Sequence, residues 1–90
     1  MKDQLKIDTE PKRLMVTSEP YVVYTRRGFQ PVIDVIDVKR RKEYFIYISA
    51  RSIADALQNM KLDNGDQFVG VEFWIRKESD ERMSPYVVED

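Results

Sequence analysis

The sequence predicts a mainly β domain with one helix, and three observations support this fold class. Short stretches rich in β-branched and aromatic residues recur along the chain, as at 21–25 and 43–48. One segment, 49–62, changes to the helical spacing of apolar residues. The length of 90 residues is enough for one domain and too short for two.

The N-terminal segment differs in composition from the rest. Residues 1–12 are polar apart from Leu5 and Ile7, so we expect a loose N-terminal arm, with at most a short strand, ahead of a single domain over 13–90. The arm has no apolar centre of the kind found in signal peptides, and no run in the chain approaches the ~20 apolar residues that span a membrane. We therefore expect a cytoplasmic protein with no membrane partner.

Two stretches with strand composition follow the arm. Residues 13–17 and 21–25 together predict one long, bent first strand, with Pro20 at the bend. A glycine and a proline then mark 26–31 as the first connecting loop. This loop also carries two adjacent arginines and a phenylalanine.

The next two strands are predicted to form a hairpin over 32–38 and 43–48, joined by a basic turn at 39–42. Asp34 and Asp37 fall on opposite faces if the alternation is strict. We expect a β-bulge near Val35-Ile36 to place both acids on one face, because small curved barrels need such bulges.

The helix is the segment with the clearest periodicity. Four apolar residues follow the i, i+3, i+4, i+7 pattern of one helical face: Ile53, Ala56, Leu57 and Met60. Ser52 with Asp55 resembles a capping box, and Ser49 is an alternative N-cap. Asn64-Gly65 supplies the residues that end the helix. We expect the apolar face to pack on the following strand.

The last two strands are predicted at 67–77 and 85–89. In the first of these, alternate residues form one apolar face: Val69, Val71, Phe73 and Ile75. Trp74 takes the other face. The resulting β-β-β-α-β-β order predicts a five-stranded OB-type Greek-key barrel with its helix between the third and fourth strands.

Residues for catalysis are largely missing from the composition. The chain has no histidine and no cysteine, and its three glycines are isolated, so we expect a non-enzyme without a cofactor or metal. Asp34 and Asp37 are the only paired carboxylates on a strand. We interpret them as solvated residues or as partners of nearby arginines.

Charge is distributed unevenly along a nearly neutral chain. The net charge is −1, from 15 basic and 16 acidic residues, yet the segment 26–51 holds seven basic residues and only three acids. Such asymmetry can create a positive field on one face. The loop 78–84 is acidic and is expected to repel phosphate.

Single-stranded nucleic acid needs cations along the phosphate path and aromatic faces for base stacking. The candidates for these roles are Arg26, Arg27, Phe29, Lys39, Arg40, Arg41, Lys42, Phe45, Tyr47, Trp74 and Arg76. Each has a structural alternative. Phe45 and Tyr47 could belong to the core, Trp74 could cover the barrel end, Phe29 could anchor its loop, and the basic turn could be a solvated hairpin.

The second half of the chain, roughly 39–89, resembles small OB-fold single-stranded DNA-binding proteins of phages and of archaeal or bacterial accessory systems. The resemblance runs through Glu43-Tyr-Phe-Ile-Tyr-Ile-Ser49, Ser52-Ile-Ala-Asp-Ala-Leu57, Asn64-Gly-Asp-Gln-Phe68, Phe73-Trp-Ile-Arg76 and Ser84-Pro-Tyr-Val-Val88. It implies ligand contacts at Phe45, Tyr47 and Trp74, with Arg40 and Arg41. The acidic 78–84 loop and the neutral net charge depart from the basic profile of such proteins.

The sequence therefore predicts non-enzymatic, sequence-tolerant binding of single-stranded nucleic acid, with DNA preferred over RNA as the expected ligand. The alternative is a protein-protein adaptor or assembly subunit, because edge strands and exposed aromatic residues on an OB-like barrel serve that role equally well.

Overall fold

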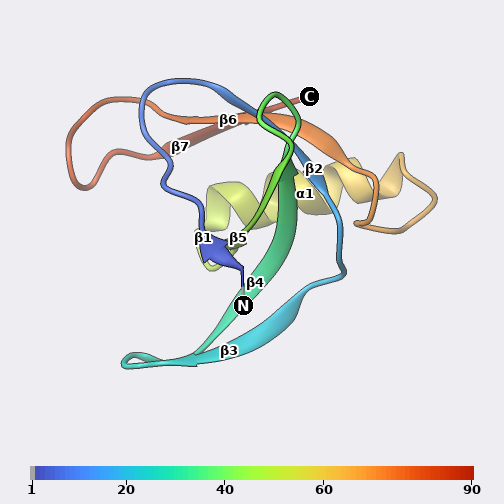
Figure 1. The fold of residues 1–90 in the computed structure, drawn as a ribbon, viewed down its shortest axis with the longest axis horizontal. Helices are drawn as coiled ribbons and strands as arrows, with labels where there is room; N and C mark the ends of the chain where they lie inside the picture. Colours follow the sequence, from blue (N-terminus) through green and yellow to red (C-terminus); the bar gives the residue numbers. More distant parts are fainter. Residues whose placement is uncertain (1) are drawn as a thin grey trace.

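The computed structural model describes residues 2–90; Met1 lies outside the described part. Within that range the protein is mainly β with one helix, as predicted, and all seven strands belong to one sheet (Figure 1). The elements are β1 (Asp3–Gln4), β2 (Lys12–Val16), β3 (Tyr21–Thr25), β4 (Gly28–Asp37), β5 (Lys42–Tyr47), α1 (Arg51–Leu62), β6 (Glu72–Lys77) and β7 (Tyr86–Glu89).

The strand order is β1-β5-β4-β2-β6-β7, with β3 also paired to β4. The predicted long first strand is two strands, β2 and β3, separated by residues 17–20. They occupy successive parts of β4: β3 pairs with Gly28–Val32, and β2 pairs with Val35–Asp37. Among residues 2–90 no pairing joins β5 to β7, so the sheet is not closed into a barrel by its own ladder.

The first connection is a tight turn, not the predicted loop over 26–31. β4 begins at Gly28 and continues through Pro31, so only Arg26 and Arg27 connect β3 to β4. Pro31 is accepted inside the strand because its pair with Val22 exchanges no backbone hydrogen bonds. The Pro31 carbonyl points to the other side of β4, where it accepts from the N–H of Ile48 at 3.0 Å. Antiparallel pairs alternate between hydrogen-bonded and non-hydrogen-bonded, and a proline can occupy only the second kind without losing a donor.

The predicted bulge in the second strand is absent. The pairing of β4 with β5 is continuous from Val32↔Tyr47 to Asp37↔Lys42. Strict alternation therefore leaves Asp34 and Asp37 on opposite faces of the sheet. The interpretation of both acids as solvated residues or as partners of nearby arginines is also wrong, because the fold buries both and, among residues 2–90, no arginine side chain forms an ion pair with either.

One face of the curved sheet carries the core, and α1 packs on this side. The core comprises Leu5, Leu14, Val16, Ile33, Val35, Ile46, Ile53, Leu57, Phe68, Val71, Phe73 and Ile75. Ile53 and Leu57 of the helix are fully buried, and Met60 packs against the same cluster, as the periodicity predicts. The predicted serine caps are not used: the N-cap is Ala50, without a side-chain hydrogen bond.

The strand after the helix is shorter than predicted, and β6 begins only at Glu72. Gly70 adopts a φ of 96°, which breaks the alternation before the strand starts. As a result Val69, expected in the core, is 44% exposed, and Phe68 is buried in its place. The Glu19 carboxylate accepts hydrogen bonds from the backbone N–H groups of both residues, at 3.2 and 3.1 Å.

The N-terminal arm includes a short strand and contacts the sheet at two places. β1 pairs in parallel with β5, and the N–H of Leu5 donates to the carbonyl of Phe45 at 3.0 Å. Further along, the carbonyl of Asp8 accepts from the N–H of Lys77 at the end of β6, at 2.7 Å. The apolar Leu5 side chain explains the anchoring, because it is buried in the core. The arm thus links β5 to β6 across the open side of the sheet.

Membrane-spanning helices are not found in the part of the chain that the structure describes, since α1 is neither long nor apolar enough to cross a bilayer.

Candidate nucleic-acid interface

The sheet formed by β3, β4 and β5 has a second face, which we call the outer face. Residues directly opposite each other in a ladder share a face. The pairs Val32↔Tyr47 and Asp34↔Phe45 therefore lie on the outer face, whereas Ile33↔Ile46 lies in the core. This confirms the predicted phase of the third strand, with its two aromatic rings directed outward.

Phe45 and Tyr47 are half-buried on this face. Their rings meet edge to face with centroids 5.6 Å apart. Val32 stands between Tyr47 on β5 and Tyr21 on β3 in the ladder and is fully buried, although it lies outside the main core. The outer face therefore has a small apolar patch, in which Val32 lies beside Tyr47 and the Tyr47 ring lies beside that of Phe45.

A pocket of 440 Å³ opens at the β3–β4 turn, and we call it the hairpin pocket. It is lined by Thr25, Arg26, Arg27, Gln30, Tyr47 and Ser49. Neither arginine forms an ion pair with any residue in 2–90. The pocket thus combines two guanidinium groups that form no ion pair within residues 2–90 with one aromatic ring and several neutral hydrogen-bonding groups.

The turn that carries the two arginines is held by Thr25. Its hydroxyl donates to the carbonyl of Gly28 at 2.9 Å and accepts from the N–H of Arg27 at 3.1 Å. Gly28 has a φ of 96°, a conformation that residues with a Cβ atom rarely adopt. These local contacts fix the backbone of the turn, so the side chains of Arg26 and Arg27 start from defined positions.

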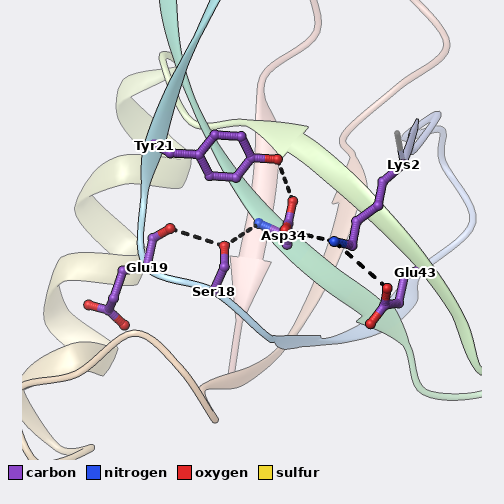
Figure 2. A network of polar contacts seen from close by, with 6 residues as sticks. All are labelled: Lys2, Ser18, Glu19, Tyr21, Asp34 and Glu43. Carbon is purple, nitrogen blue, oxygen red and sulfur yellow. Dashed lines mark hydrogen bonds and ion pairs between the residues drawn. The ribbon is translucent and has the colours of Figure 1, made fainter.

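Asp34 lies at the centre of a polar network on the outer face (Figure 2). Its carboxylate accepts hydrogen bonds from the Tyr21 hydroxyl at 2.6 Å and from Lys2 Nζ at 3.1 Å. Its backbone N–H donates to the Ser18 hydroxyl at 3.0 Å. The hydrogen bond to the carboxylate raises the pKa of Tyr21 to about 12, with burial as the second cause.

The same lysine reduces the negative charge of this part of the face. Lys2 Nζ lies 3.1 Å from the Asp34 carboxylate and 3.8 Å from that of Glu43. The hydrogen bond to Asp34, followed by its charge, raises the pKa of Lys2 and keeps the ammonium protonated. One cation from the arm thus faces two acids from β4 and β5.

Asp37 has a different structural role at the far end of β4. Its carboxylate accepts hydrogen bonds from the backbone N–H groups of Lys39 and Arg40, at 3.0 and 3.1 Å. The N–H of Arg41 donates to the Asp37 carbonyl at 2.7 Å. An aspartate before a turn commonly binds backbone groups in this way. It organises the basic turn and does not bind an arginine side chain.

Trp74 lies beside the basic turn and not beside Tyr47. A 140 Å³ pocket, here the turn pocket, is lined by Glu10, Pro11, Lys12, Arg13, Asp37, Lys39, Arg40 and Trp74. The indole is 43% exposed, and the Arg13 guanidinium lies 5.6 Å from its centroid. Arg76 is on the same face and lines an adjacent pocket with Trp74.

Besides Phe45 and Arg76, three predicted residues line neither of the two pockets. Phe29 is 72% exposed on the opposite face of the hairpin, edge-on to Tyr24 with centroids 5.1 Å apart. It therefore neither anchors the loop nor approaches Tyr47. Lys42 Nζ lies over the Tyr44 ring and 3.8 Å from the Asp3 carboxylate. Arg41 occupies the turn with a φ of 56°.

The two basic clusters are separated by the length of β4. The strand has ten residues, which corresponds to about 30 Å at ~3.3 Å per residue. This separation exceeds the Debye length of about 8 Å at physiological salt, so the clusters act as separate charges. Only an extended ligand can contact both.

Sequence reasoning missed four residues of this surface: Lys2, Arg13, Tyr21 and Gln30. Lys2 belongs to the polar arm, which has no pattern that predicts its position. Arg13 and Tyr21 lie on predicted strands, but their proximity to Trp74 and Asp34 depends on strand pairing. Gln30 could not be recognised because 26–31 was expected to be a loop.

No known protein family matches the chain, and no curated protein or solved structure is significantly similar to it. Among residues 2–90, no group of acidic side chains has the arrangement needed to hold a metal ion.

Proposed function

We propose that the outer face binds single-stranded nucleic acid, with DNA as the expected ligand, starting from the hairpin pocket. The observation that carries this proposal is the position of Arg26 and Arg27 on the same pocket as Tyr47. Guanidinium groups bind phosphate oxygens through several donors at once, and a tyrosine ring offers a stacking surface for any base. Both features serve a ligand without regard to its sequence.

The fold supports the proposal through its topology, which we interpret as a partly open OB-type barrel. β6 lies beside β2, and β2 with β3 leads to β4 and β5, which is the 4-1-2-3 spatial order of a Greek key. The N-terminal arm links β5 to β6 on the open side. OB folds bind oligonucleotides on the face of their second and third strands, which correspond here to β4 and β5.

The negative charge of the acids on this face is partly neutralised, which weakens its repulsion of a phosphate chain. Lys2 contacts both Asp34 and Glu43, so the centre of the outer face carries one cation for two carboxylates. A strand that leaves the hairpin pocket would pass over Tyr47 and Phe45 and then this partly neutralised centre. Lys39 and Arg40 at the turn pocket would receive its other end.

Fluorescence anisotropy with a labelled oligo-dT tests the proposal. The double variant Arg26→Ala/Arg27→Ala should weaken binding and lower the salt slope by about 1.4, because each phosphate contact on a single strand contributes about 0.7. The matched control is Arg51→Ala/Arg82→Ala, which removes two exposed arginines that lie outside both pockets. Equal slopes for the wild-type protein and the first variant would exclude the hairpin pocket.

A specific observation favours the adaptor as the second candidate. The reverse face of the β3–β4 hairpin exposes Val22, Tyr24 and Phe29, an apolar group with no charged member. A protein partner on this face would bind with little dependence on salt, since charged contacts are absent. A protein that fails to bind any oligonucleotide at low salt would leave this candidate as the better account.

A further inference from the structure

We infer that β3 is the contact between two copies of this chain, which pair antiparallel along its free edge. Within residues 2–90 this strand pairs only with β4 and contacts no other element. In Figure 1 it runs along the margin of the molecule, far from α1. Its outer edge therefore presents backbone donors and acceptors without partners among the described residues.

The backbone groups at this edge can be assigned. Val22 faces Pro31, which has no N–H, so this pair is non-hydrogen-bonded, and by alternation so is Tyr24↔Phe29. The N–H and carbonyl groups of Val22 and Tyr24 therefore point away from β4. Those of Tyr21, Val23 and Thr25 point toward it.

Only one antiparallel register uses all of these free groups. With Val23 opposite Val23 of the second copy, Val22 faces Tyr24 of that copy and Tyr24 faces Val22. Both residues then exchange N–H and carbonyl groups in hydrogen-bonded pairs. A shift in one direction would use Pro20, which has no donor, and a shift in the other would need the turn residue Arg26.

The charges favour a second copy over a different strand. β3 has no charged residue, so identical strands can lie side by side without repulsion. Proteins usually protect edge strands with charges, prolines or bulges, and none of these occurs inside Tyr21–Thr25.

The pairing is closed, because the two-fold axis passes through the Val23 pair and uses the free edge of β3 in both copies. It therefore produces a dimer and not a fibre. The axis is perpendicular to the sheet, so the outer faces of both copies lie on the same side. Two hairpin pockets would then share one continuous surface, although the dimer does not depend on what that surface binds.

A single cysteine tests the register, because the natural chain contains none. In the variant Val23→Cys the two cysteines would lie opposite each other in a non-hydrogen-bonded pair, with Cα atoms about 4.5 Å apart, which a disulfide can span. In the control Thr25→Cys the two thiols would lie on opposite ends of the paired strands. We expect oxidation to give a covalent dimer for Val23→Cys and none for Thr25→Cys, because cysteines with Cα atoms more than about 7 Å apart cannot be bridged.

The matching measurement without a disulfide is sedimentation of Val22→Pro. Proline removes an outward N–H and leaves the β4 ladder intact, so this variant should be monomeric where the wild-type protein is dimeric. Equal cross-linking of the two cysteine variants, a wild-type monomer at all concentrations, or a Val22→Pro dimer would each overturn the inference.

Discussion

The phenol of Tyr21 and the carboxylate of Asp34 form a 2.6 Å hydrogen bond that joins β3 to the middle of β4. Neither residue faces the main core, and the ladder between the two strands ends at the Tyr21↔Val32 pair, before Asp34. The bond therefore fixes the position of β3, and with it the hairpin, relative to the body of the protein.

This bond predicts a specific alkaline titration. The pKa of Tyr21 is about 12, above its ordinary value of 10.0, because the neutral phenol donates to a carboxylate. A raised pKa in the folded state means that the contribution to stability is complete below pH 10 and is lost as the pH rises towards 12. Tyr21→Phe should cost about 1 kcal/mol near neutral pH, as for a typical hydrogen bond, and little at pH 12.

Phenolate absorbance at 295 nm provides the measurement. The difference between the wild-type protein and Tyr21→Phe isolates one of five tyrosines. Tyr24→Phe is the control, since that ring is 77% exposed and has no hydrogen bond to a carboxylate. If the Tyr21 component titrates at its ordinary pKa of 10.0, the bond to Asp34 does not persist in solution.

The packing of α1 gives a second prediction. Leu57 is 1% exposed within the core cluster, so Leu57→Ala should lower the free energy of unfolding by about 2–5 kcal/mol. Gln58→Ala on the exposed side of the same helix should change it by less than about 0.5 kcal/mol. Urea denaturation of both variants measures the contrast. Similar small changes would place the helix off the core.

These two predictions also show which parts of the structure sequence patterns can supply. The helix and the third strand follow from periodicity, because burial on one side imposes a local repeat on residues such as Leu57 and Tyr47. The Tyr21–Asp34 bond cannot be obtained in this way, since it depends on which strands pair and in which register. The contacts of the arm are equally hidden from composition: Leu5 is buried and Ile7 packs against the core, within a segment that is mostly polar.

Trp74 reports on the turn pocket, because it is the only tryptophan in the chain. If the nucleic acid extends to this pocket, saturating oligo-dT should quench its fluorescence, and Trp74→Ala should lose about 1–3 kcal/mol of binding free energy, as for other stacked bases. Trp74→Phe is the control that retains a ring. Binding with unchanged emission would confine the ligand to the hairpin pocket and leave Trp74 as a structural partner of Arg13.

The two basic clusters predict a dependence on ligand length. They lie about 30 Å apart along β4, so a short oligomer can occupy the hairpin pocket alone while a long one reaches Lys39 and Arg40. Replacing Arg40 and Arg41 with glutamate should weaken long oligo-dT by about tenfold or more and flatten its salt dependence, because phosphate contacts are lost at one end. Short oligomers should bind almost as before, since Arg26 and Arg27 are unchanged. The measurement is a length series of oligo-dT against both proteins at two salt concentrations.

The backbone of the turn should survive the change, because it is held by the Asp37 carboxylate through N–H groups and not through the arginine side chains. A uniform loss at every length would instead mean that the charge reversal acts over the whole face, and no loss at any length would make the basic turn a solvated hairpin.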